Sequence, residues 1–242
     1  MAGLSAADIL TAWERASAGA CPQTLAILEV AFPDRPRGEL AALPLGARDA
    51  MLLSVRMETF GRGMDGLAEC PSCGATVQFA LDAGELAKNA PPPQPGEGSV
   101  EVGGRVAVYR LPTTADLDAV SGERDCEGAA RRLAGRCVIR VDGHGDAALE
   151  GAADDDVLDA VAHGIDRDDP LAGMDLDLLC PACGERWPAP FDAASFVVSE
   201  FQHQARRLLL EVDALARAYG WREEDILRMP DARRELYVGL VS

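Results

Sequence analysis

A short motif, CPxCG, occurs twice in this sequence, at residues 70–74 and again at residues 180–184. A CxxC turn places two thiols on the same side of a tight loop, and the glycine after the second cysteine can adopt a positive φ. Two such turns supply four thiolates, which is the ligand set of a closed tetrahedral zinc site. We therefore predict one structural zinc ion per chain, bound by Cys70, Cys73, Cys180 and Cys183.

The residues that follow the two motifs also repeat. Apolar residues alternate with other residues at positions that match when counted from the first cysteine: Val77, Phe79 and Leu81 in one copy, and Trp187, Ala189 and Phe191 in the other. A period of two is typical of a strand with one buried face. We expect each copy to fold as strand, cysteine turn, strand and helix, and the two copies together to form a zinc ribbon.

Other uses of the four cysteines fit this pattern less well. A thioredoxin-type redox centre needs a single CxxC where a strand meets a helix. A catalytic zinc site keeps an open coordination position and uses histidine or carboxylate ligands. Disulfides are disfavoured because the remaining three of the seven cysteines, Cys21, Cys126 and Cys137, cannot all be paired within one chain. We interpret those three as small buried apolar residues in a reducing compartment.

The composition is that of a globular protein. With 242 residues and 48% hydrophobic content, the chain can bury a substantial core. No apolar run approaches the roughly 20 residues of a membrane span, and the N-terminal residues do not form a secretory signal. We therefore expect a cytoplasmic protein without a membrane partner.

The net charge of −17 disfavours nucleic acid as a ligand. The 23 basic residues are outnumbered by 40 acidic ones, whereas phosphate backbones are bound through lysine and arginine. A local basic patch formed by Arg131, Arg132 and Arg136 is the alternative that the sequence leaves open.

The order of patterns along the chain predicts an α+β fold. Helical periodicity dominates both ends, and from Val197 to Tyr219 apolar residues recur in steps of three and four. That helix needs a partner, either the N-terminal helices of the same chain or another subunit. A stretch rich in proline at 90–96 leads into a small inserted α/β segment, which opens with a hairpin around Gly103 and Gly104.

These patterns divide the chain into five parts. They are an N-terminal helical region at 1–64, the first cysteine turn with its linker at 65–96, the inserted segment at 97–170, the second cysteine turn at 171–196 and a C-terminal helical region at 197–242.

The sequence contains no recognisable set of catalytic residues. His144, His163 and His203 are scattered and match no metalloprotease spacing, and no phosphate-binding loop or nucleophile elbow occurs. We interpret Asp154 to Asp156 as the acidic start of a helix, because the alternating ligands and terminal glutamate of a calcium loop are missing. We therefore predict that the protein is not an enzyme.

Three parts of the sequence carry a resemblance to a known family. They are residues 43–49 leading to 58–61, the two CPxCG motifs, and residues 218–221 leading through 225–227 to 233–237. Together they resemble the bacterial relatives of the T-even phage baseplate protein family, which occur with contractile phage tails and phage-tail-like injection systems. Family members without the cysteine motifs share mainly the helical part, so the zinc ribbon and the inserted segment are departures from the pattern.

The resemblance implies a structural component of a baseplate, or a chaperone-like protein that helps to build its hub. The implied partners are other baseplate or tail hub proteins, bound by the helical surfaces around Phe201 to Tyr237, and no catalytic residues are implied. The protein would stay in the cytoplasm or be incorporated into a phage-tail-like particle. The alternative from another class is a zinc-ribbon regulator that binds nucleic acid or the transcription machinery.

Overall fold

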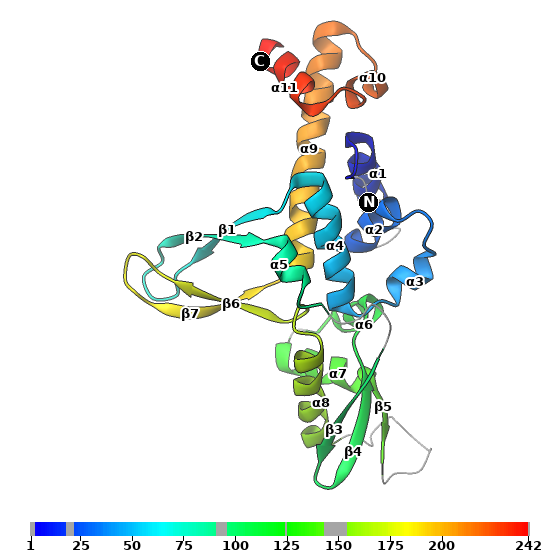
Figure 1. Cartoon of the computed structure of the whole chain (residues 1–242), viewed down its shortest axis with the longest axis vertical. Coiled ribbons are helices and arrows are strands. Elements are labelled where there is room, and N and C mark those ends of the chain that lie inside the picture. Colours follow the sequence, from blue (N-terminus) through cyan, green and yellow to red (C-terminus); the bar gives the residue numbers. More distant parts are fainter. Residues whose placement is uncertain (1–2, 18–21, 91–95, 124, 143–153, 242) are drawn as a thin grey trace. The chain divides into compact units, whose positions relative to one another are not determined.

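The structure is a computed structural model that describes residues 3–17, 22–90, 96–123, 125–142 and 154–241. It mixes helices and strands, in agreement with the sequence prediction at that level (Figure 1). Cys21 and His144 lie outside the described residues.

Contacts between residues divide the chain into two compact units, which are described separately. The helical unit contains Met1–Arg37, Leu52–Arg62 and Ala194–Ser242. The mixed unit contains Gly38–Met51 and Gly63–Ala193.

The helical unit is organised around one long helix, α9. Its elements are α1 (Ala6–Ser17), α2 (Gln23–Ala31), the C-terminal part of α4 (Leu45–Phe60), α9 (Ala193–Tyr219), α10 (Glu223–Leu227) and α11 (Asp231–Val241). The predicted apolar stripe of α9 is buried at Val197, Phe201, Ala205, Leu208 and Leu215. Phe201 packs on Phe60 of α4 with ring centroids 5.0 Å apart. The stripe thus has packing partners within the same chain, as one of the two predicted alternatives requires.

Charged and aromatic residues join α9 to the C-terminal helices of the same unit. Glu211 is buried in the α9 stripe, where its Oε2 accepts a hydrogen bond from Nε of the fully buried Arg234 at 2.6 Å. Tyr219 stacks on Trp221 at 4.5 Å, and Tyr237 meets Trp221 edge-on at 5.0 Å. These contacts join α9, and Trp221 just after it, to α11.

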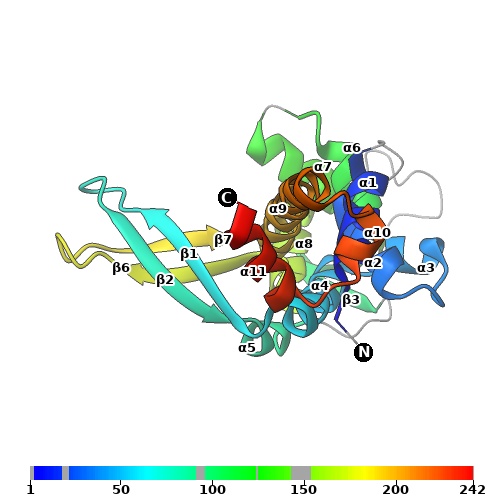
Figure 2. The ribbon, with the colours of Figure 1, turned by 90° about the horizontal axis from the view of Figure 1, so that it is seen from above.

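Two antiparallel hairpins carry the cysteines of the mixed unit. The first hairpin consists of β1 (Gly63–Glu69) and β2 (Thr76–Asp82), and the second of β6 (Met174–Leu179) and β7 (Arg186–Phe191). Both are followed by a helix, α5 (Ala83–Ala87) or α9, so the predicted order of strand, turn, strand and helix is confirmed twice. The hairpins project together from the mixed unit, with their cysteine turns at the far end (Figure 2).

The inserted segment forms its own small α/β structure between the hairpins in sequence. Its strands β3 (Glu97–Val102), β4 (Arg105–Arg110) and β5 (Val138–Val141) form an antiparallel sheet in the order β3-β4-β5. Its helices are α6 (Thr114–Val120), α7 (Cys126–Cys137) and α8 (Asp155–Asp168). The predicted hairpin turn is present, with positive φ at both Gly103 and Gly104.

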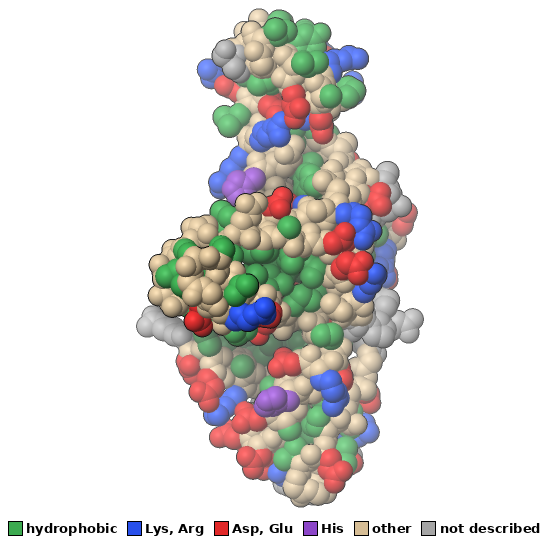
Figure 3. Space-filling view, turned by 60° about the vertical axis from the view of Figure 1, so that its left-hand side comes forward, with side chains coloured by type: hydrophobic (Ala, Val, Ile, Leu, Met, Phe, Trp, Pro, Cys, Tyr) green, Lys and Arg blue, Asp and Glu red, His purple; other side chains and the backbone are tan. Residues whose placement is uncertain are grey.

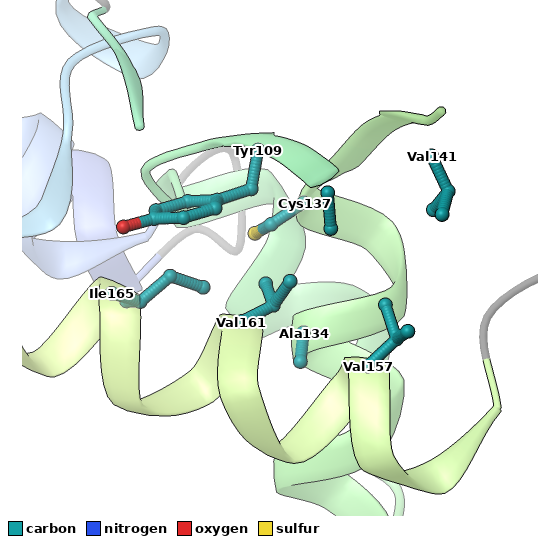
Figure 4. Packing of buried hydrophobic residues seen from close by; sticks show 8 residues of the cluster. Tyr109, Ala134, Cys137, Val141, Val157, Val161 and Ile165 are labelled. Atoms are coloured by element: carbon teal, nitrogen blue, oxygen red, sulfur yellow. The ribbon is translucent and has the colours of Figure 1, made fainter. Parts of the chain in front are cut away.

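A continuous apolar core holds the inserted segment together. Side chains from β4, α7, β5 and α8 point towards one another (Figure 4), and the buried ones are Ala107, Tyr109, Ala134, Cys137, Val141, Val157, Val161 and Ile165. Cys137 is buried as predicted, but the prediction for Cys126 is wrong because this residue is exposed. Cys126 begins α7 directly after the capping residue Asp125, about two to three turns before Ala134 and Cys137, the residues that α7 buries.

The start of α4 is attached to the inserted segment within the mixed unit, where the short helix α3 (Arg37–Ala41) precedes it. Pro44 pairs with Thr113, and the backbone N–H of Leu45 donates to the carbonyl of Pro112 at 3.0 Å. The backbone N–H of Gly46 donates to Oδ2 of Asp169 at 2.9 Å. Residues 43–49 therefore form a structural junction within the mixed unit.

Candidate metal centre

The four cysteines of the two hairpins form one cluster. The sulfur atoms of Cys70, Cys73, Cys180 and Cys183 all lie within 4.8 Å of one another. Sγ of Cys70 is 3.7 Å from Sγ of Cys183, and Sγ of Cys73 is 3.7 Å from Sγ of Cys180. A disulfide would bring two sulfurs to about 2.05 Å, whereas four sulfurs at about 2.3 Å from a tetrahedral metal ion lie about 3.8 Å apart. The spacing is therefore that of a metal site.

Each cysteine turn is built by the same backbone hydrogen bonds. The N–H of Cys70 donates to the carbonyl of Ala75 at 2.9 Å, and the N–H of Gly74 donates back to the carbonyl of Cys70 at 2.9 Å. The second turn repeats both bonds with Cys180, Glu185 and Gly184. Gly74 and Gly184 have φ of 70° and 77°, which a residue with a Cβ rarely adopts. These hydrogen bonds and φ values fix the position of each pair of thiols within its own turn.

The cluster is apolar on its inner side and open on its outer side. Cys70 and Cys180 are buried, whereas Cys73 and Cys183 are exposed. Val77 is buried against the inner cysteines, and Ala75 and Trp187 pack beside them. In Figure 3, where the hairpins point towards the reader, few charged side chains lie over the cysteine turns. This small cluster is too limited to hold two hairpins together without further bonds.

The thiols differ in pKa because backbone donors and neighbouring sulfurs act on them differently. The backbone N–H of Cys183 lowers the pKa of Cys180 to about 7. At Cys73 the backbone N–H of Ala75 also favours the thiolate, but hydrogen bonds with Cys183 and Cys180 oppose it and raise the pKa to about 12. The neighbouring sulfurs thus oppose ionisation of Cys73, and a bound cation would favour its thiolate.

The other polar residues singled out from the sequence have structural roles. The side chain of Asp154 accepts a hydrogen bond from the N–H of Val157 at 3.1 Å and caps α8, as predicted for an acidic helix start. Nδ1 of His163 and Nδ1 of His203 each lie within hydrogen-bond distance of the carbonyl four residues earlier in their own helices. Among the residues that the structure describes, the four cysteines are the one group arranged to hold a metal.

The three arginines proposed as a basic patch are paired with carboxylates. Arg131 contacts Glu127 at 2.8 Å, Arg136 contacts Asp116 at 3.1 Å, and Arg132 pairs with Glu123. These contacts neutralise much of the positive charge that phosphate groups would need.

A buried polar cluster at the start of α4 was missed from the sequence. Arg48 pairs with Asp49 at 2.7 Å and donates to Oγ1 of Thr114 at 3.3 Å. Burial raises the pKa of Asp49 to about 6 and also raises the pKa of Asp169 above its usual value. The only sequence signal was the 43–49 motif, which does not indicate which distant residues it contacts.

Comparison of the chain with protein-family models, with curated proteins and with solved structures finds no match. Among the described residues, no helix combines the length and the apolar character needed to cross a membrane.

Proposed function

We propose that this chain is a structural or chaperone-like assembly protein of a contractile phage tail or a phage-tail-like injection system, with one structural zinc ion in a ribbon formed by its two hairpins. The clustering of four thiols from two distant motifs supports the metal site of this proposal. The resemblance of the sequence to relatives of the T-even phage baseplate proteins supports the kind of assembly.

Zinc is the ion that this ligand set favours. Four thiolates in a tetrahedral arrangement are typical of structural zinc, and they leave no open position for a substrate or a water. Closing a loop of the length that separates the motifs costs about 4–5 kcal/mol of chain entropy. Structural zinc contributes roughly 10–16 kcal/mol in small peptides. The ion thus outweighs the cost of closure, and its role here is to hold structure.

The protein contacts are assigned to the C-terminal helices. Leu210 of α9 and Leu236 and Leu240 of α11 are 72%, 72% and 74% exposed, although each is a large apolar side chain. Leu236 and Leu240 lie one turn apart on α11, and a contiguous exposed apolar patch is typical of an interaction surface. Phe201, with which the predicted contact region begins, is buried and belongs to the core instead.

A zinc-ribbon regulator of nucleic acid or the transcription machinery is the competing proposal. The net charge of −17 and the pairing of Arg131, Arg132 and Arg136 with carboxylates argue against it. Salt-sensitive binding to DNA or RNA at physiological ionic strength would favour the regulator over the tail protein.

Elemental analysis of protein purified without added metal tests the zinc site. We expect one zinc per chain, and none in a variant with all four cysteines of the cluster replaced by serine. A metal-free wild-type protein with folded hairpins would overturn the zinc proposal.

Co-expression with any tail-tube or hub proteins encoded in the same gene cluster tests the assembly role. We expect a complex that survives size-exclusion chromatography and is weakened by a L210S/L236S/L240S variant. A matched variant at exposed Leu67 of the first hairpin, Leu67→Ser, should leave this complex intact. The assembly role is wrong if the wild-type chain associates with none of these proteins.

A further inference from the structure

The two hairpins have the same register but different outer edges. Counted from the first cysteine, Gln78 and Ala80 of β2 occupy the positions of Pro188 and Pro190 in β7. Proline has no backbone N–H, so it can occupy a strand only where that N–H would point away from the paired strand. This difference between β2 and β7 therefore affects the backbone hydrogen bonds that each strand can offer, and not the metal site.

The hydrogen-bond pattern shows which backbone groups point outwards. Cys70 donates its N–H to Ala75, which makes these two residues a hydrogen-bonded pair. Such pairs alternate with pairs whose N–H and carbonyl groups face away from each other. Following the register, Gln78 opposite Leu67 and Ala80 opposite Asp65 belong to the second kind. The N–H groups of Gln78 and Ala80 therefore point to the outer edge of β2.

The same alternation places the prolines on the outer edge of β7. Cys180 donates to Glu185, so Pro188 opposite Asp177 and Pro190 opposite Asp175 are again outward-facing pairs. The missing N–H groups thus remove two donors that an added strand would need. The second hairpin is blocked at the edge where the first is open.

Of the four hairpin edges, the edge of β2 is the least protected. The outward-facing positions of β1 include Asp65 and Glu69, and those of β6 include Asp175 and Asp177. Charged side chains at an edge oppose the addition of another strand. At β2 these positions are Thr76, Gln78 and Ala80, all uncharged and exposed, and then Asp82, whose carboxylate caps α5. Among the described residues, no further strand pairs with β2.

The charge of the first hairpin indicates what could be added. Residues 63–82 contain acidic side chains but no lysine or arginine. Asp65 and Glu69 lie on the same exposed face as Gln78, with the 71% exposed Leu67 between them. In the second hairpin, by contrast, Asp177 is paired with Arg186 at 2.9 Å. A second copy of the acidic hairpin would be repelled, whereas a basic strand would be attracted.

We propose that the outer edge of β2 binds an extended, lysine- or arginine-bearing segment of a partner protein as an added β-strand. Backbone hydrogen bonds to Gln78 and Ala80 supply the binding, and the carboxylates of β1 select for positive charge. This proposal rests on the proposed function, in which a zinc ion holds the two hairpins together.

A set of eight-residue peptides that alternate lysine or arginine with threonine or valine provides the probe. The full-length, metal-containing protein is titrated with each peptide, and amide hydrogen exchange is followed by NMR. We expect the amides of Gln78 and Ala80 to become protected on binding. The amides of Val77 and Phe79, which already bond to β1, should change little.

Variants that exchange the two edges provide matched controls. Q78P/A80P gives β2 the edge of β7 and should weaken peptide binding at least about tenfold, with zinc content and circular dichroism unchanged. The reverse variant P188Q/P190A should create a second binding edge. Peptides with glutamate in place of every basic residue should not bind.

Several results would overturn the proposal. They are no binding by any basic peptide, equal binding by wild type and Q78P/A80P, or protection that does not fall on Gln78 and Ala80. Self-association that Q78P/A80P abolishes would instead assign the edge to a second copy of the chain. Zinc content and exchange of the hairpin amides are measured on the same wild-type sample. A protein that holds zinc and protects its hairpin amides but binds no peptide contradicts only the proposal for β2, whereas a protein without zinc contradicts the proposed function.

Discussion

The hairpins and the inserted segment are both small antiparallel structures, but they are held together in different ways. In the inserted segment, side chains from two strands and two helices share a buried core. In the local apolar cluster of the hairpins, Val77 is the one buried residue besides Cys70 and Cys180. A two-stranded hairpin is marginally stable by itself. In the proposed zinc site, four sulfurs and a metal ion would take the place of a core that the hairpins are too small to build.

The centre of the inserted segment is Tyr109, whose ring is fully buried. The ring fits between two glycines, Gly98 of β3 and Gly164 of α8, where a Cβ on either residue would collide with it. Its hydroxyl donates to Oδ2 of Asp168 at 2.7 Å. Burial and this bond raise the pKa of Tyr109 to about 12. Removal of metal should therefore affect the hairpins and leave the inserted segment folded, since this segment has a core of its own.

The largest effect is expected from removal of the metal. A zinc chelator should abolish amide protection in β1, β2, β6 and β7 while β3, β4 and α8 stay protected, because roughly 10–16 kcal/mol of metal binding is lost from the hairpins alone. Hydrogen–deuterium exchange followed by mass spectrometry of proteolytic peptides measures the protection of each strand and helix. Cys126→Ser, at an exposed cysteine outside the cluster, serves as the control and should change nothing. Hairpins that remain protected after chelation would contradict the comparison.

The converse change is Tyr109→Ala. It should destabilise the inserted segment by about 3–5 kcal/mol, because it leaves a cavity at the centre of the core. Zinc content should be unaffected. Tyr109→Phe keeps the ring and loses two hydrogen bonds of the hydroxyl, the one it donates to Asp168 and the one it accepts from Nη2 of Arg167, so it should cost about 1–2 kcal/mol. Urea unfolding followed by NMR signals of β4 and α8 gives both values, and equal costs for the two variants would rule out the proposed role of the ring.

Acid should weaken the inserted segment through Asp116, which receives hydrogen bonds from Arg110 at 2.6 and 2.9 Å and from Arg136 at 3.1 Å. Burial opposes ionisation of this carboxyl, but the bonds from Arg110 and Thr113 prevail and hold its pKa below the usual range. A lowered pKa in the folded state means that the stabilisation is complete above about pH 4 and is lost as the pH falls.

Asp116→Asn tests this acid dependence in metal-free protein, where the thiols bind no ion. The variant should lose about 2–3 kcal/mol at neutral pH, and its free energy of unfolding should change less with pH below about pH 4 than that of the wild type. Urea unfolding at several pH values measures the slope. The same slope in both proteins would show that another carboxyl is responsible.

Local patterns predicted the repeated parts of the molecule, whereas long-range partners could not be predicted. The cysteine turns, the Gly103-Gly104 hairpin and the α9 stripe follow from residues close in sequence, because backbone geometry and periodicity act locally. The pairing of Glu211 with Arg234 and the bond from Gly46 to Asp169 join distant segments. Helical periodicity favoured apolar Val212 for the stripe, yet the buried neighbour is Glu211, because an arginine from α11 satisfies it.

The smallest effects should come from two helical glycines of the inserted segment, which test how tightly its core is packed. A Cβ at Gly164 would collide with the Tyr109 hydroxyl, so Gly164→Ala should cost about 1–3 kcal/mol. A Cβ at exposed Gly135 of α7 would make an ordinary contact with Leu158 at 3.7 Å. Gly135→Ala should therefore stabilise the segment by about 0.5–1 kcal/mol, because alanine favours helix. Thermal unfolding of both variants in metal-free protein gives the sign of each change in stability. A loss for Gly164→Ala and a gain for Gly135→Ala are expected only if the core, and not the metal, sets the stability of this region.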